Sequence, residues 1–123
     1  MTAVRLDPAV EAAVARVARE HPATAFNVNY ADADGRDLAL ALRDTLVAAG
    51  WSQLSAAGPA PGFSRKGLIV WAPAEGRGIA DDIADALTAA FAVQVIERTD
   101  GGPVALTVGV ATWATARGVR PER

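Results

Sequence analysis

The fold is decided by Phe26–Ser55, FNVNYADADGRDLALALRDTLVAAGWSQLS, because the chain repeats this stretch. Shifted by 41 residues, it falls without a gap on Gly67–Ile96, GLIVWAPAEGRGIADDIADALTAAFAVQVI. Apolar residues at helical spacing coincide in the two copies: Leu38, Leu42 and Leu46 lie over Ile79, Ile83 and Leu87. The repeat therefore predicts two consecutive β-α-β units.

The first unit begins with alternating apolar and polar residues at Phe26–Tyr30, which is typical of a half-buried strand. Its helix is expected over 36–49, followed by a glycine that favours a helix end, and a short strand over 51–55. The second unit is expected as a buried strand over 67–71, a helix over 78–91 and a strand over 92–98.

Thr99-Asp100-Gly101-Gly102 has the composition of a hairpin turn, which predicts that the following strand, 103–110, pairs with 92–98. Before the repeat, Asp7-Pro8 is typical of a helix start, and we expect an N-terminal helix over 7–20. Its narrow apolar stripe leaves open whether it packs on its own domain or on a partner helix. We expect one domain over 1–123, with an α/β core over 26–110, a trailing segment over 111–123 and loose chain ends.

The connector Ala56–Ser64 is too short and too rich in glycine and proline to hold a crossover helix. The second strand is therefore expected to run antiparallel to the third. This order, α-βαβ-βαβ-β, predicts an α+β fold, a ferredoxin-like two-layer sandwich with an extra N-terminal helix and a C-terminal hairpin strand. We expect its first and third strands as parallel neighbours in the middle; a fully parallel doubly wound sheet is the alternative.

The composition argues against several classes of function. A net charge of -2 with no basic run argues against nucleic-acid binding and against a polybasic membrane anchor. Without cysteine, disulfides, thiol catalysis and Cys-ligated metals are excluded. We expect neither a metal nor a cofactor. Abundant alanine, and arginine at every basic position except Lys66, indicate a GC-rich bacterial source, and without a visible signal peptide or membrane span we expect a soluble, cytoplasmic protein.

The loops after the two expected central strands, Asp34-Gly35-Arg36 and Glu75-Gly76-Arg77-Gly78, are the candidate ligand site. If the strands are parallel neighbours, both helix N-termini point to one end, where their N–H groups attract anions. Gly35, Arg36, Gly76, Arg77 and Gly78 would then hold a phosphate or carboxylate. The alternative, favoured by the nearby acidic residues, is that these cap the helices and pair with the arginines.

The sheet face without helices is the candidate interface. By the expected alternation, this face carries Asn27, Asn29, Leu68, Val70, Gln94, Ile96, Ala105 and Thr107. Leu68, Val70 and Ile96 are too apolar for a fully hydrated surface, which predicts cover by the N-terminal helix, by the segment with Trp113 or by a second copy of the chain. The asparagine pair also allows a small cleft with a polar floor.

Three functions follow as hypotheses. The first is a non-enzymatic module for self-association, as a homo-oligomer, or for docking on a larger protein. The second is a regulatory domain that binds a small anion at the paired loops. The third is a small enzyme of ferredoxin-like fold that uses Tyr30, His21 or a loop carboxylate, although the sequence contains no recognisable catalytic motif.

Overall fold

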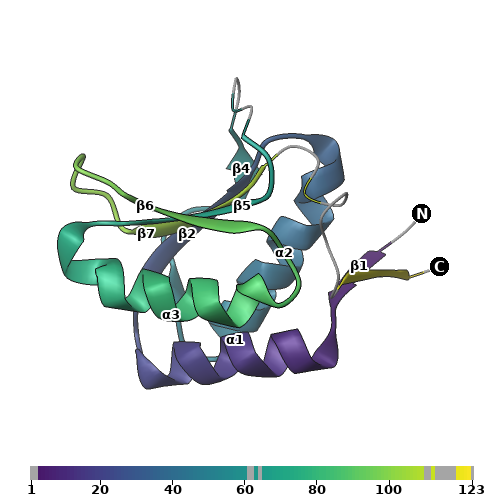
Figure 1. Ribbon diagram of the computed structural model, residues 1–123, viewed down its shortest axis with the longest axis horizontal. Coiled ribbons are helices and arrows are strands. Elements are labelled where there is room, and N and C mark those ends of the chain that lie inside the picture. Colours follow the sequence, from purple (N-terminus) through teal and green to yellow (C-terminus); the bar gives the residue numbers. More distant parts are fainter. Residues whose placement is uncertain (1–2, 61–62, 64, 110–111, 113–118, 123) are drawn as a thin grey trace.

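The computed structural model describes residues 3–60, 63, 65–109, 112 and 119–122 (Figure 1). These residues form an α+β fold with three α-helices and a mixed six-stranded sheet. The elements in chain order are β1 (Ala3–Leu6), α1 (Pro8–Glu20), β2 (Ala25–Tyr30), α2 (Ala33–Ala48), β3 (Ser52–Gln53), β4 (Gly58–Pro59), β5 (Leu68–Ala72), the short 3-10 helix η1 (Ala74–Gly76), α3 (Arg77–Thr88), β6 (Val93–Glu97), β7 (Val104–Val108) and β8 (Val119–Glu122). The predicted α+β class is confirmed.

The strand order differs from the expected ferredoxin-like order. The sheet runs β3-β2-β7-β5-β6, and β4 also pairs with β2. Strand β7 pairs in parallel with β2 and antiparallel with β5, so β2 and β5 are not neighbours and run in opposite directions. The short second strand, β3, pairs in parallel with β2 and is not paired with the third strand, β5. The alternative of a fully parallel sheet is also wrong, because β5 and β6 run against β2 and β7.

The predicted C-terminal hairpin is not formed either. Strand β6 pairs with β5, and β7 lies on the other side of β5. The connection from β6 to β7 therefore passes over the end of β5, where the backbone N–H of Arg98 donates to the Ala72 carbonyl at 2.8 Å. The glycine-rich turn is real, but it joins strands that are two positions apart.

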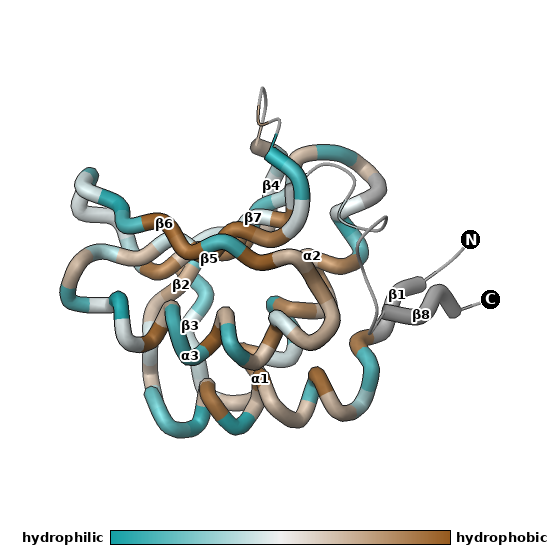
Figure 2. Tube along the Cα trace, viewed as in Figure 1, coloured by the Kyte–Doolittle hydropathy of each residue, from teal (hydrophilic) through white to brown (hydrophobic). Residues whose placement is uncertain are grey.

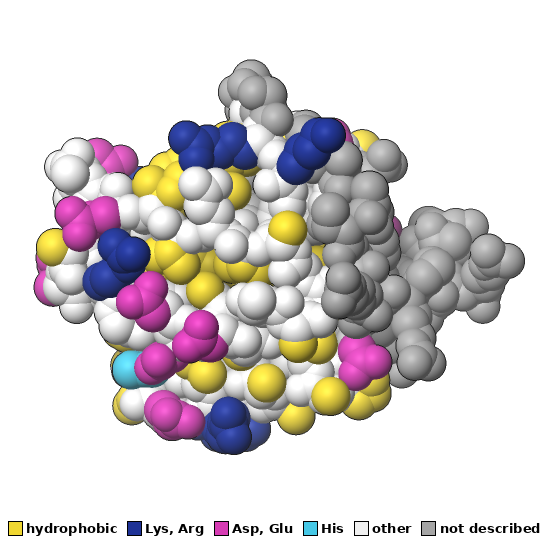
Figure 3. Space-filling model, viewed as in Figure 1, with side chains coloured by type: hydrophobic (Ala, Val, Ile, Leu, Met, Phe, Trp, Pro, Cys, Tyr) yellow, Lys and Arg dark blue, Asp and Glu magenta, His cyan; other side chains and the backbone are white. Residues whose placement is uncertain are grey.

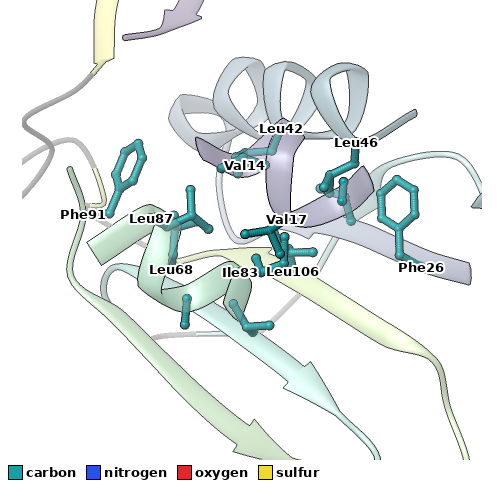
Figure 4. Close-up of a cluster of buried hydrophobic side chains, with 14 of the residues drawn as sticks. Val14, Val17, Phe26, Leu42, Leu46, Leu68, Ile83, Leu87, Phe91 and Leu106 are labelled. Carbon is teal, nitrogen blue, oxygen red and sulfur yellow. The ribbon is translucent and has the colours of Figure 1, made fainter. Parts of the chain in front are cut away.

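All three helices lie on one side of the sheet (Figure 1). Helices α2 and α3 pack on the strands, and α1 packs mainly against α2 and α3. Figure 4 shows Val14 and Val17 of α1 among the side chains of the other two helices and the sheet. The structure thus answers the question that the sequence left open: α1 packs on its own domain.

Two polar contacts fix the end of α1. The buried Trp51 Nε1–H donates to the Ala18 carbonyl at 3.0 Å. His21 Nε2 lies 2.9 Å from Asp82 Oδ2 on α3. The start of α1 is capped as predicted, since the Asp7 carboxylate accepts from the Ala9 N–H at 3.0 Å.

Helix α2 starts earlier than expected, because Asp32 is its N-cap and accepts from the Gly35 N–H. Its end forms the expected glycine cap. Gly50 has φ +110°, and the N–H groups of Gly50 and Trp51 donate to the carbonyls of Val47 and Leu46, each at 3.0 Å. This pair of bonds is a Schellman motif, which glycine favours because it adopts positive φ without strain.

Strand β5 presents the opposite faces to those expected. Leu68 and Val70 are 1% and 0% exposed and belong to the helix-side core, whereas Ile69 and Trp71 lie on the other face. Figure 2 shows how hydrophobic the central strands are, which is why alternation alone did not fix the faces of β5. Ile69 is itself fully buried, so the chain covers part of its own second face.

The two ends of the chain, which we expected to be loose, pair with each other: β1 and β8 form a two-stranded antiparallel sheet. None of the helices in the described part of the chain has both the length and the apolar character needed to cross a membrane. Figure 3 shows acidic and basic side chains interspersed on the face in view, with hydrophobic atoms between them.

Candidate functional site

A cavity of about 480 Å³ lies on the sheet face opposite the helices. This volume is within the range of small-molecule sites. Its lining comes from three central strands and from the segments on either side of them: Asn29, Ala60, Phe63, Trp71, Glu97, Arg98, Thr99, Asp100, Ala105 and Thr107. The cavity thus combines two aromatic rings with polar groups.

The floor of the cavity contains a chain of hydrogen bonds across β5, β7 and β2. Trp71 Nε1–H donates to Thr107 Oγ1 at 3.0 Å, and the Thr107 hydroxyl donates to Asn29 Oδ1. The indole N–H can only donate, and the Thr107 hydroxyl passes its own hydrogen to the Asn29 oxygen. The Asn29 amide accepts through its oxygen, so its NH₂ group takes no part in this chain of hydrogen bonds, and Asn29 lines the cavity.

An aromatic wall closes one side. The ring of Phe63 meets the ring of Trp71 edge to face, with centroids 6.4 Å apart and planes at 68°. Ala60 adjoins them, held beside β2 by a 2.8 Å hydrogen bond from its N–H to the Tyr30 carbonyl. Such a wall offers flat apolar surface to a ligand.

Another part of the lining is formed by the connection between β6 and β7. Arg98 donates to Asp100 twice, from Nε to Oδ1 at 2.7 Å and from Nη2 to Oδ2 at 2.8 Å. Its Nη1 donates to the Pro103 carbonyl at 2.8 Å. Gly102 has no side chain, and a Cβ there would come within 2.3 Å of the guanidinium carbon, so glycine is what lets Arg98 lie against the turn. We refer to Arg98, Asp100 and Gly102 as the latch.

Arg98 and Asp100 are both held in their charged forms. The Arg98 hydrogen bonds and the Gly102 N–H, at 3.0 Å from Oδ1, hold the pKa of the Asp100 carboxyl well below its usual range. The Asp100 carboxylate in turn raises the pKa of Arg98. Both effects stabilise the ionised pair.

The structure does not bring the predicted anion-binding residues together. Because β2 and β5 run in opposite directions, Gly35 and Arg36 lie at one end of the sheet, and Gly76, Arg77 and Gly78 lie at the other. Their backbone groups are also used locally. The Gly35 N–H donates to Asp32 at 3.0 Å, and the Gly76 N–H donates to the Pro73 carbonyl at 2.9 Å. The shared site rested on parallel neighbouring strands, and that premise is wrong.

Gly35 has a packing role instead. A Cβ at this position would lie 2.8 Å from the Val108 Cγ1 atom, so glycine allows α2 to approach β7 closely. At the other loop, α3 has no side-chain cap, and Arg77 Nε donates to Asp81 Oδ1 at 3.2 Å rather than to the neighbouring Glu75.

Two predicted interface residues are misplaced. Leu68 and Val70 are buried beneath the helices and cannot contact a partner without unfolding of the core. Ile96 is half-buried and lies beside Trp71 in the register, on the face with the cavity. Trp113 lies outside the described residues.

The candidate catalytic side chains do not gather. His21 pairs with Asp82 at the surface, and neither His21 nor Tyr30 lines the cavity. Across the described part of the chain, no three His, Cys, Asp or Glu side chains are grouped so that they could hold a metal ion.

Sequence reasoning found one part of the cavity and missed the rest. Of the asparagine pair that could line a cleft with a polar floor, Asn29 lines the cavity and Asn27 does not. Trp71 was missed because β5 was assigned the wrong face. The latch was missed although a signal was present: arginine two residues before aspartate, followed by Gly-Gly, allows the side chains to pair across a tight turn.

No protein-family model, curated protein or solved structure matches this chain.

Proposed function

We propose that the protein is a binding domain for a small organic molecule, held in the cavity on the sheet face opposite the helices. The observation that carries the proposal is the lining of that cavity, in which a fixed amide, a latched arginine and two aromatic rings converge. Apolar walls with a few oriented polar groups are the usual composition of a ligand site. The proposal keeps ligand binding from the second sequence hypothesis, which expected a small anion at the paired loops, and assigns it to this cavity instead.

The hydrogen-bond chain supports preorganisation. Trp71 donates to Thr107, and Thr107 donates to Asn29, so the Asn29 amide is oriented before a ligand arrives. A group that is already oriented loses less entropy on binding than a free side chain does. Binding without reaction is the simpler proposal, because neither His21 nor Tyr30 lines the cavity and the loop carboxylate that does, Asp100, is paired with Arg98.

A thermal-shift and tryptophan-fluorescence screen with small aromatic and heteroaromatic compounds tests the proposal, since Trp71 lines the cavity. Compounds that bind should lose affinity in Asn29→Ala. Asn27→Ala is the matched control: Asn27 is on the same strand and face, but it accepts from Ser55 at 2.9 Å and does not line the cavity. If no compound binds at millimolar concentration, or if both variants weaken binding equally, the proposal is wrong.

Self-association stays a second proposal, and one observation favours it. Among the described strands, β6 pairs only with β5, so its outer edge carries unpaired backbone groups of the kind that pair with another chain. The occupant proposed is a second copy of the chain, with two β6 strands side by side. Native mass spectrometry should show a dimer that Ile96→Lys converts to a folded monomer; a wild-type monomer at micromolar concentration would contradict the idea.

A further inference from the structure

The charges that face the cavity cancel. Arg98 carries one positive charge and Asp100 one negative charge, joined by two short hydrogen bonds. Glu97 also borders the cavity, but its register partner on β5 is Ala72, which belongs to the helix-side core. Directly opposed residues share a face of the sheet, so the Glu97 side chain belongs to the other face. The charged side chains that the cavity presents to a ligand are therefore the two members of this ion pair.

The pair does not separate easily. The Arg98 side chain is 23% exposed and is also bound to the Pro103 carbonyl, while Gly102 leaves the space that its guanidinium fills. An anionic ligand that approaches Arg98 meets the Asp100 carboxylate beside it. A cationic ligand that approaches Asp100 meets the guanidinium. In both cases an attraction is offset by a repulsion of similar size.

Hydrogen-bond donors remain available all the same. A guanidinium has more N–H groups than the bonds to Asp100 and Pro103 use. The Asn29 NH₂ group adds donors at the floor, because its oxygen is taken by Thr107. These donors require an acceptor on the ligand, and Trp71 and Phe63 provide apolar surface for a flat ring.

We propose that the cavity selects uncharged, planar molecules that carry a hydrogen-bond acceptor, such as aromatic carboxamides, and discriminates against the corresponding anions and cations. This inference rests on the proposed function, because it names the ligand class of the same site. It also excludes the small anion that the sequence suggested as the ligand.

Three compounds of nearly equal shape separate the possibilities: benzamide, benzoate and benzamidine, which are neutral, anionic and cationic near neutral pH. We expect titration calorimetry or ligand-observed NMR to show benzamide binding about tenfold more tightly than either ion. Its affinity should fall in Asn29→Ala and be retained in Asn27→Ala.

Asp100→Asn tests the reason for the preference. The substitution removes the compensating charge and keeps an oxygen acceptor for Arg98, so benzoate should then bind at least as tightly as benzamide. Asp81→Asn is the matched control, because it makes the same change in net charge beside Arg77, whose ion pair does not line the cavity. If Asp100→Asn fails to fold, the comparison of the three compounds on the wild-type protein still decides.

The outcomes separate the inference from the proposed function. If benzoate or benzamidine binds as tightly as benzamide, the inference is overturned and the binding site stands. If none of the three binds while other screened compounds bind through Asn29, the ligand class is wrong and the site again stands. If nothing in the screen or among the three binds, both proposals fail.

Discussion

Replacing Thr107 with valine removes the centre of the hydrogen-bond chain beneath the cavity. Thr107 is 3% exposed and bonded on both sides, to Trp71 and to Asn29. Each lost bond costs about 1 kcal/mol net, which gives about 2 kcal/mol. The added methyl group recovers about 0.8 kcal/mol through apolar burial. We therefore expect Thr107→Val to lower the free energy of unfolding by about 1 kcal/mol.

Urea unfolding followed by tryptophan fluorescence measures this loss, as a lower midpoint with an unchanged slope. Thr45→Val is the control, because the Thr45 hydroxyl donates only to the Ala41 carbonyl in its own helix, and we expect a change of less than about 0.5 kcal/mol. Combining Thr107→Val with Asn29→Ala should give a coupling energy of about 0.5–1 kcal/mol, since both remove the same bond. Strictly additive effects, or equal losses for Thr107 and Thr45, would refute the reasoning.

Three further changes test other contacts. Trp51→Phe should lower the free energy of unfolding by about 2–3 kcal/mol, because it removes the bond to the Ala18 carbonyl and leaves a smaller ring; a loss below about 1 kcal/mol in urea unfolding would contradict this. Gly109→Ala should lower the free energy of unfolding by about 3 kcal/mol, because its Cβ would lie 2.2 Å from a backbone oxygen. Gly78→Ala, in the open first turn of α3, should raise it by about 0.5–1 kcal/mol, and melting temperatures that shift alike in the two variants would refute the contrast. Asp100→Asn should lower the melting temperature at neutral pH, and this difference should shrink as pH falls below about 4, because the stabilisation by a carboxyl with a lowered folded-state pKa is complete above its unfolded pKa and is lost as pH falls towards its folded pKa. A difference that does not change with pH would count against the latch.

The repeat predicted the two helices correctly and the faces of β5 incorrectly, whereas the faces expected for β2, β6 and β7 agree with the structure. Leu42 and Ile83 coincide at the 41-residue shift, and both are fully buried. The same shift places Val28 over Ile69, yet the residue of β5 that faces the helices with Val28 is Val70. The second unit therefore has one residue fewer between the core-facing strand residue and the core-facing helix residue: Val70 to Ile83, compared with Val28 to Leu42. A slip of one residue exchanges the two faces of a strand, and the apolar sequence of β5 gives no alternation that would reveal the slip.

The directions of the strands could be predicted from local sequence rules, whereas the identity of neighbouring strands in the sheet could not. The short connector correctly implied that the chain turns back after the first unit, so that β5 runs against β2. Since β-α-β units keep their own strands parallel, this reversal already excluded a parallel pairing of the first and third strands. The insertion of β7 between them depends on contacts distant in sequence, and a turn signal at Asp100-Gly101 cannot report which strands it joins.

The insertion of β7 is also what creates the cavity. Because β7 lies between β2 and β5, Thr107 has Asn29 beside it on one strand and reaches Trp71 on the other. The connection that leads into β7 must pass over the end of β5, and this path carries Arg98 and Asp100 to the same face as Trp71. If β6 and β7 formed a hairpin as neighbours, the turn that carries Arg98 and Asp100 would lie beside β6 only. The latch and the polar floor would then lie on different parts of the surface. The feature that local sequence patterns did not predict is therefore the one that assembles the candidate site.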